Sequence, residues 1–230
     1  MAKHKKHTKG EKNIEAVEGA LSKTEQYIEK NQNLIFWVVG VIVVIAAVYI
    51  GYTRYVLEPR EQMAKSEIFI AEQYFEKDSL TLALYGDGLN LGFLDIISEY
   101  RMTRTANLAK YYAGLSYLKL GNYDEAIDHL KSYRARDQIL GAMALGAIGD
   151  AYLQLNKPNN ALRYYTRAYR YQPNNFTTPI FLFKAAQLNE YKNNYSEALK
   201  LYKQIRDEYQ DSQEARNIDR YIARAQQMID

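Results

Sequence analysis

The chain has 230 residues, of which 47% are hydrophobic and 25% are charged, with four Pro and twelve Gly. This composition excludes collagen-like and wholly disordered chains. The absence of Cys excludes a disulfide framework, a thiol nucleophile and a thiolate metal site, and a formal net charge of +3 is too small to indicate a nucleic-acid partner.

Residues 1–33 form a basic segment that carries seven Lys. Its first ten residues are expected to be an irregular cytoplasmic tail. Apolar side chains then recur on one helical stripe from Ile14 to Ile28, and Ser22 precedes Glu25 at capping-box spacing, which predicts a short amphipathic helix. That stripe could lie on a membrane surface or dock on a partner.

An uncharged block follows at residues 31–53. The nineteen residues from Leu34 to Tyr52 would rise about 1.5 Å each in a helix, close to the ~30 Å hydrocarbon thickness of a bilayer. One alternative is a buried core helix, which the lack of a polar face disfavours. Another is a cleaved signal peptide, which is disfavoured because the apolar run begins only at residue 34. We therefore predict a single transmembrane signal anchor at residues 34–53.

The orientation of the anchor follows from the positive charges beside it. Seven Lys precede the span, whereas residues 54–70 carry three basic residues, Arg54, Arg60 and Lys65. Because Lys and Arg are enriched in cytoplasmic flanks, the N-terminus is expected in the cytoplasm and residues 54–230 on the other side of the membrane.

Residues 54–106 are expected to hold a linker helix and a degenerate leading helix pair. The pair would run from Pro59 to Tyr74 and from Leu89 to Tyr100, with Pro59 as the first helical residue. The glycine-rich stretch 85–92 lacks the Gly-Lys-Ser/Thr of a phosphate loop and the ligand spacing of a calcium loop, so it is interpreted as a turn.

Residues 107–211 contain three similar units. The intervals between Ala126, Ala161 and Ala198 are 35 and 37 residues, near the 34-residue period of a helix-turn-helix repeat. Small residues also recur earlier in each unit, at Gly114, Gly149 and Ala186.

This pattern resembles the tetratricopeptide repeat. The second unit carries nearly the whole signature, at Leu145, Ile148, Gly149, Tyr152, Ala161, Tyr165, Ala168 and Pro173. The first unit departs from the signature with Lys110 at the position of the large residue, and the third departs from it with Asn189 in place of Tyr. The small residues would let paired helices approach closely, and Tyr117, Tyr152, Tyr165 and Tyr202 would fill the space between pairs.

The predicted fold class is therefore all-α: a single N-terminal transmembrane helix followed by a tetratricopeptide-repeat α-solenoid. We expect about three full repeats, one degenerate leading pair and a capping helix at residues 212–230, with Ser212 as its N-cap.

The sequence shows no pattern of catalytic residues, so a non-enzyme with no cofactor and no metal is expected. His4 and His7 lie in the tail, where no fixed geometry is expected, and His129 is expected on a solvated helix face. No Ser-centred nucleophile turn is present in the sequence.

Stacked repeats form a groove lined by the first helix of each pair, which suits extended or helical peptide segments. Each residue expected to face it could instead pack between repeats. The residues expected to face the groove are Leu108, Tyr111, Leu115, Asp150, Gln154, Phe183, Gln187 and Tyr191.

The layout as a whole resembles a narrower family, the ancillary Sec-translocon subunits (YfgM-like) of bacterial inner membranes, most closely in residues 92–127. The resemblance implies a single-pass inner-membrane protein with residues 54–230 in the periplasm. It also implies association with the Sec translocon and with a membrane-anchored prolyl-isomerase-like chaperone. We expect the groove to hold a segment of such a partner or a nascent secretory chain.

Two other functions stay open. One is a cytosol-facing receptor of the import type, which needs the opposite orientation. The other is a scaffold for envelope assembly or cell division, although the chain lacks the lipid-attachment Cys of the outer-membrane repeat proteins in that class.

Overall fold

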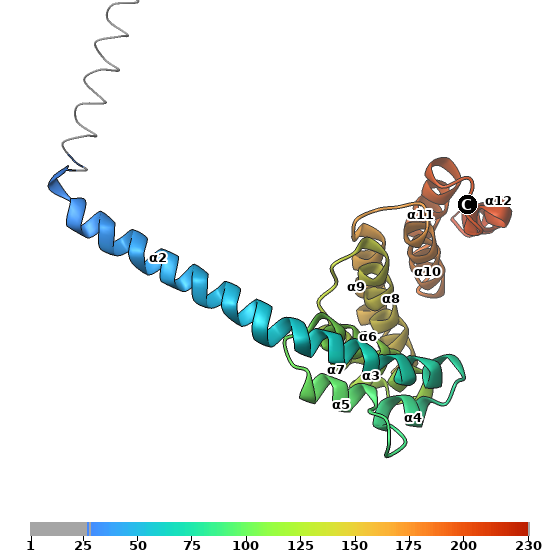
Figure 1. Cartoon of the computed structure of the whole chain (residues 1–230). Coiled ribbons are helices and arrows are strands. Elements are labelled where there is room, and N and C mark those ends of the chain that lie inside the picture. The colour runs from blue at the N-terminus through green and yellow to red at the C-terminus, as the bar shows by residue number, and fades with distance from the viewer. Residues whose placement is uncertain (1–26, 28, 230) are drawn as a thin grey trace, which may run out of the picture. The chain divides into compact units, whose positions relative to one another are not determined.

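The computed structural model describes residue 27 and residues 29–229, and every regular element in this part is helical, with no strand (Figure 1). The predicted basic tail, and most of the short amphipathic helix, lie outside the described residues. The chain divides into two compact units, one ending at Glu58 and one beginning at Pro59.

The first unit contains α2, Gln32–Tyr52, which is followed by a five-residue π-helix, Thr53–Leu57. No residue of α2 is buried, and its Val, Ile and aromatic side chains are exposed, except for the half-buried Ile35. Its best 18-residue window has a mean hydropathy of 2.8, so the helix is long and apolar enough to cross a membrane by length and composition. A span within residues 34–53 thus stays a prediction.

The second unit is an α-solenoid built on three consecutive helix pairs, α6–α7, α8–α9 and α10–α11, each packed against the next. Three further helices precede the pairs, and a 3-10 turn and one helix follow them. The bounds are α3 Glu58–Glu76, α4 Leu80–Tyr85, α5 Phe93–Glu99, α6 Arg104–Leu120, α7 Tyr123–Ser132, α8 Gln138–Gln154, α9 Pro158–Arg170, α10 Thr177–Tyr191, α11 Tyr195–Glu208, a 3-10 turn Glu214–Asn217 and α12 Ile218–Gln227.

Local side chains set where these helices begin and end. The Thr103 hydroxyl accepts a hydrogen bond from the Ala106 amide at 3.0 Å and starts α6. The Asp137 carboxylate accepts from the Ile139 and Leu140 amides and starts α8. Gly121 ends α6 at φ 83°, a left-handed conformation that glycine adopts without a steric penalty.

The two helices of each pair approach closely because the contacting residues are small. A Cβ added to Gly114 would lie 2.5 Å from Leu130 on α7, and one added to Gly149 would lie 2.6 Å from Tyr165 on α9. The facing residues Ala126, Ala161 and Ala198 are fully buried, as is Ala186 on α10. The predicted role of the small residues is confirmed.

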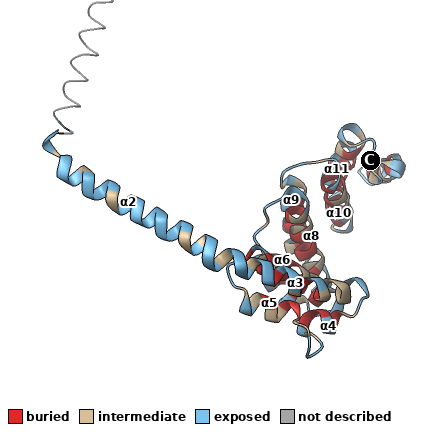
Figure 2. Ribbon diagram, in the orientation of Figure 1, coloured by how far each residue is buried: buried red, intermediate tan, exposed pale blue. Residues whose placement is uncertain are grey.

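Three clusters of buried side chains follow one another along the solenoid (Figure 2). The first joins α3, α4 and α5 to α6, the second joins α6 and α7 to α8 and α9, and the third runs from α8 to α12. Each repeat therefore hides its apolar faces only against its neighbours, as expected of a solenoid.

The leading region differs from the prediction. The helix α4 was not expected. Its Leu80, Ala83 and Leu84 are buried, and Ala83 and Leu84 belong to the first cluster. The following helix, α5, begins at Phe93 instead of Leu89, because the preceding residues form a loop closed by Asp87.

That loop is the glycine-rich stretch interpreted above as a turn. The Asp87 carboxylate accepts hydrogen bonds from the Tyr74 hydroxyl at 2.7 Å and from the Leu89 and Asn90 amides. These bonds, the one from Tyr74 first, hold the pKa of Asp87 well below its usual range. A Cβ on Gly92 would lie 2.3 Å from the Leu84 carbonyl oxygen, so glycine serves close backbone packing here.

At the C-terminal end, the predicted capping segment is a 3-10 turn followed by α12. The Ser212 hydroxyl accepts a hydrogen bond from the Ala215 amide at 3.2 Å, so Ser212 caps the 3-10 turn and not α12 itself. Ile218 and Ala225 of α12 are buried in the third cluster.

The packing between repeats predicts the effect of one added methyl group. A Cβ on Gly146 of α8 would lie 1.9 Å from the ring of Phe181 on α10, which is buried. We expect Gly146→Ala to lower the free energy of unfolding by about 1–3 kcal/mol, measured by urea denaturation of the full chain in detergent micelles. The control is Gln154→Ala, at an exposed position of the same helix, with a change of about 0.5 kcal/mol or less. A gain of stability in Gly146→Ala would contradict the packing argument.

Candidate functional site

The second unit carries a hollow of about 500 Å³ between α8 and α10, lined by residues of both helices and by one side chain of α9. Its lining residues are Asp150, Leu153, Tyr165, Lys184, Gln187, Leu188 and Tyr191. A neighbouring hollow of about 420 Å³ shares Gln187 and Tyr191 and reaches α12. Together the two hollows form one surface, which we name the C-terminal groove.

One wall of this groove is a polar network centred on Asp150. Its carboxylate accepts a hydrogen bond from the Tyr165 hydroxyl at 2.7 Å and two from the Lys184 ammonium at 2.7 and 2.8 Å. Tyr165 belongs to the same helix pair as Asp150, whereas Lys184 belongs to the next repeat. Burial, followed by the negative charge of Asp150, raises the pKa of Tyr165.

A second network of the same kind closes the other end of the groove. The Glu190 carboxylate accepts from the Tyr202 hydroxyl at 2.8 Å and from the Arg224 guanidinium at 3.1 and 2.5 Å. Arg224 also lies over the Tyr221 ring, 5.0 Å from its centroid. The capping helix thus supplies the cation that a further repeat would otherwise supply.

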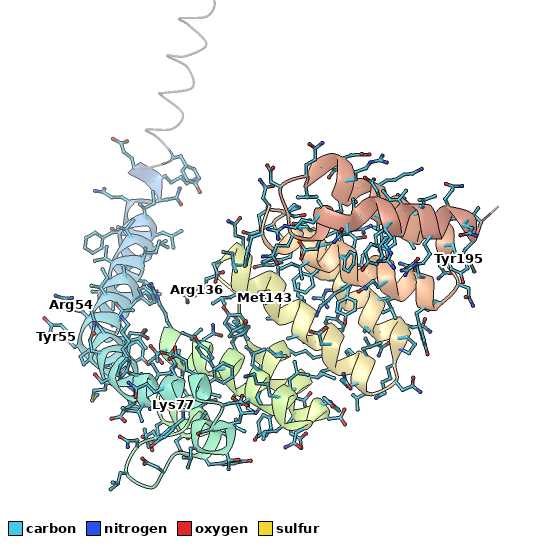
Figure 3. The ribbon with its side chains drawn as sticks, turned by 90° about the vertical axis from the view of Figure 1, so that its right-hand side faces the viewer. Arg54, Tyr55, Lys77, Arg136, Met143 and Tyr195 are labelled. Atoms are coloured by element: carbon cyan, nitrogen blue, oxygen red, sulfur yellow. The ribbon has the colours of Figure 1, made fainter. Side chains whose placement is uncertain are left out.

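The apolar part of the groove is exposed. Tyr191 is 74% exposed and Met228 is 54% exposed. Tyr195 stands at the start of α11 at the outer end of this surface (Figure 3). Exposed aromatic and thioether groups beside an amide and two charged pairs suit a polypeptide ligand.

Three of the residues predicted to face a groove do line this one: Asp150, Gln187 and Tyr191. Gln154 is exposed at the end of α8, next to Leu153, but does not line either hollow. The positions of Asp150, Gln187 and Tyr191 follow from the helical spacing along α8 and α10, the first helices of their pairs.

The other four predicted groove residues lie in hydrophobic packing. Tyr111 is only 6% exposed and packs against Tyr112 and Tyr133, so its predicted place in a groove is wrong. Leu108 and Leu115 are partly buried against the second cluster, because α6 is covered there by neighbouring helices. Phe183 packs against the rings of Tyr202 and Tyr221, with centroids 5.8 and 4.9 Å away.

Several groove residues were not predicted. Lys184 lies three residues before Gln187 and seven before Tyr191, so the helical stripe through those two residues could have identified it. Arg224 and Met228 come from the capping helix, and their approach to α10 depends on how that helix packs. No sequence pattern carries that information.

The described residues do not gather ligands for a metal ion. Among the described residues no group of three or more His, Asp and Glu side chains could hold a metal ion. His129 is half-buried and stacks on the Tyr117 ring at 5.3 Å, which differs from the solvated face predicted for it. Burial lowers its pKa.

Comparison with known proteins agrees with this architecture. Residues 101–210 match the family model described as Psidin, N-terminal TPR repeats region. A crystal structure of a Podosopora anserina kinesin light chain variant with nearly identical TPR-like repeats superposes with a TM-score of 0.54 at 12% sequence identity. That similarity covers 74% of this chain and 87% of the other, and at this identity it shows the fold alone. No curated protein matches the chain significantly.

The buried tyrosines predict how stability depends on pH. Burial raises the pKa of Tyr111 to about 12, and the pKa of Tyr165 and that of Tyr202 are also raised. The unfolded chain loses phenol protons from about pH 10, whereas the folded chain keeps them to higher pH. The stabilisation is therefore present below pH 10 and lost as the pH rises from 10 through 12.

We expect urea denaturation to show a falling free energy of unfolding between pH 10 and 12, with about 2 kcal/mol of the loss due to Tyr111. The control is Tyr111→Phe, which keeps the ring and every Lys but removes this phenol. Its loss over the same range should be smaller, and an identical loss in both proteins would contradict the assignment.

Proposed function

We propose that this chain, whose residues 101–210 form tetratricopeptide repeats, is a membrane-anchored protein-interaction scaffold that binds a polypeptide segment in the C-terminal groove. The observation that carries the proposal is the groove itself, an exposed aromatic and amide surface on a rigid stack of helices. A binding role without catalysis is part of the proposal.

The chemistry of the groove supports a polypeptide ligand. Tyr191 and Leu153 offer exposed apolar surface, and the Gln187 amide can both donate and accept hydrogen bonds. The carboxylates of Asp150 and Glu190 are already paired with cations. These polar walls therefore orient a bound ligand more than they attract it by net charge. Because the lining comes from packed helices, little of it needs to be ordered on binding.

The apolar helix α2 supports the membrane anchor. All of its large apolar side chains except the half-buried Ile35 are exposed, and a helix that is apolar all round requires an apolar environment. The excess of Lys before the helix favours an N-terminus in the cytoplasm and a C-terminal unit in the periplasm.

The most specific form of the proposal is an ancillary subunit of the bacterial Sec translocon. It rests on the resemblance of residues 92–127 to that family. The groove would then hold a membrane-anchored prolyl-isomerase-like chaperone, a translocon segment or a nascent secretory chain. An envelope-assembly or cell-division scaffold, and a cytosol-facing import-type receptor, are the alternatives.

The orientation can be tested because the chain has no native Cys. Leu89 is 95% exposed in the second unit, so Leu89→Cys provides a label site there. In spheroplasts of a bacterial host, we expect a membrane-impermeant maleimide to label Leu89→Cys, whereas Lys9→Cys in the N-terminal segment reacts only after lysis. The opposite pattern would favour the cytosol-facing receptor, and release of the protein by alkaline carbonate would argue against an anchor.

The groove can be tested by replacing Tyr191 with a photo-crosslinking amino acid in living cells. We expect a crosslink to a Sec-translocon subunit, a membrane-anchored chaperone or a secretory chain, identified by mass spectrometry. The control position is Phe176, which is 62% exposed and lies outside the groove. Crosslinks to envelope-assembly or division proteins would select that alternative, and equal products at both positions would argue against the groove.

A further inference from the structure

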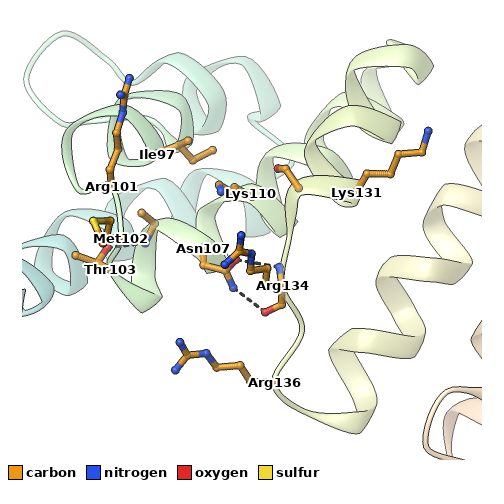
Figure 4. A pocket seen from close by; sticks show the side chains of 11 residues that line it. Ile97, Arg101, Met102, Thr103, Asn107, Lys110, Lys131, Arg134 and Arg136 are labelled. Atoms are coloured by element: carbon orange, nitrogen blue, oxygen red, sulfur yellow. Dashed lines mark hydrogen bonds between the residues drawn. The ribbon is translucent and has the colours of Figure 1, made fainter.

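A second concave surface lies away from the C-terminal groove. It has a volume of about 700 Å³ and lies between α5, the start of α6, the end of α7 and the linker to α8 (Figure 4). Of its eleven lining residues, five are basic and none is acidic. The basic residues are Arg101, Lys110, Lys131, Arg134 and Arg136. We name this surface the basic pocket.

The segment that carries two of these cations is held in place. The Asn107 amide donates to the Arg134 carbonyl oxygen and accepts from the Arg134 amide, both at 2.9 Å, as the dashed lines in Figure 4 show. Three residues after Arg134, the Asp137 carboxylate caps α8. The backbone between these points is therefore fixed, while the side chains of Arg134 and Arg136 are exposed.

The cations of the pocket are not neutralised from within. Across the described residues, no ion pair joins Arg101, Lys110, Arg134 or Arg136 to a carboxylate. Lys131 differs from these four, because its ammonium donates a hydrogen bond to the Tyr152 hydroxyl at 3.1 Å.

Two carboxylates bonded to segments beside the pocket, those of Glu61 and Asp137, have other partners. Glu61 accepts hydrogen bonds from the Arg104 amide at 2.6 Å and from the Thr105 hydroxyl at 3.0 Å. Asp137 accepts from the first amides of α8. Four cations therefore line one concave surface without a carboxylate partner, and an anionic ligand that enters the pocket meets positive charge that the described chain does not pair.

We propose that the basic pocket binds an acidic segment of a partner polypeptide, as a second contact separate from the groove. Arg guanidinium groups match carboxylates bidentately, and Ile97 and Met102 offer apolar surface to the methylene groups of Glu side chains. The concave form suits a chain of several residues better than a flat membrane surface.

The proposal can be tested with the full chain in a non-ionic detergent. The probe is a fluorescein-labelled ten-residue peptide of alternating Glu and Ala, compared with the same peptide carrying Gln in place of Glu. We expect the Glu peptide to bind at least tenfold more tightly by fluorescence anisotropy. Its affinity should also fall as NaCl is raised from 50 to 500 mM, because the contacts are partly exposed to solvent.

The matched variants are Arg134→Gln with Arg136→Gln, and, as a control, Arg216→Gln with Arg220→Gln on exposed sites at the capping end. The first pair should weaken binding of the Glu peptide about tenfold, and the second pair should change it less than twofold. Arg101→Gln, on a different segment, provides an independent variant should the first pair alter the helical circular dichroism.

Equal binding of the Glu and Gln peptides, or no effect of both basic-pocket variants, would overturn the proposal. Tighter binding of phosphatidylglycerol vesicles or of a single-stranded oligonucleotide, with loss in the same variants, would overturn it in favour of another anion. The groove variant Tyr191→Ala should leave binding of the Glu peptide unchanged, so this test is independent of the proposed function.

Discussion

The two helices of each repeat lie close together, and the rest of the second unit depends on this approach. At Gly114 and Gly149 even one added carbon would overlap Leu130 or Tyr165. Bulkier residues there would push the paired helices apart and expose the apolar faces that the next repeat covers. Since each pair is covered only by its neighbours, the spacing within one pair also sets the surface on which the following pair stacks.

The C-terminal groove is a consequence of that same packing. The close approach of α9 to α8 brings the Tyr165 hydroxyl to Asp150, and the approach of α11 to α10 brings Tyr202 to Glu190. Each carboxylate then accepts from a cation on the next element of the stack, Lys184 in one case and Arg224 in the other. The polar walls of the groove are therefore tied to the core.

The two candidate binding surfaces differ in chemistry. In the groove, the charges are paired and the exposed groups are aromatic, apolar and amide. The basic pocket instead keeps unpaired cations on the linker between two repeats, a segment whose backbone is held by Asn107. A partner with one apolar segment and one acidic segment would engage both surfaces, and linking two contacts in one ligand strengthens binding beyond either alone.

The sequence by itself determined the class of the fold. Small residues at the helix contacts, recurring at intervals of 35 and 37 residues, specify paired helices, because small side chains permit the close approach. Helical spacing also predicted that Asp150 of α8 and Gln187 and Tyr191 of α10 lie on the groove-facing sides of their helices. The tertiary structure decided what covers each face: α6 is enclosed by neighbours, which buries Tyr111, whereas the corresponding face of α10 stays open. Arg224 and the basic pocket likewise join residues from different elements, and their meeting depends on packing angles that no local pattern encodes.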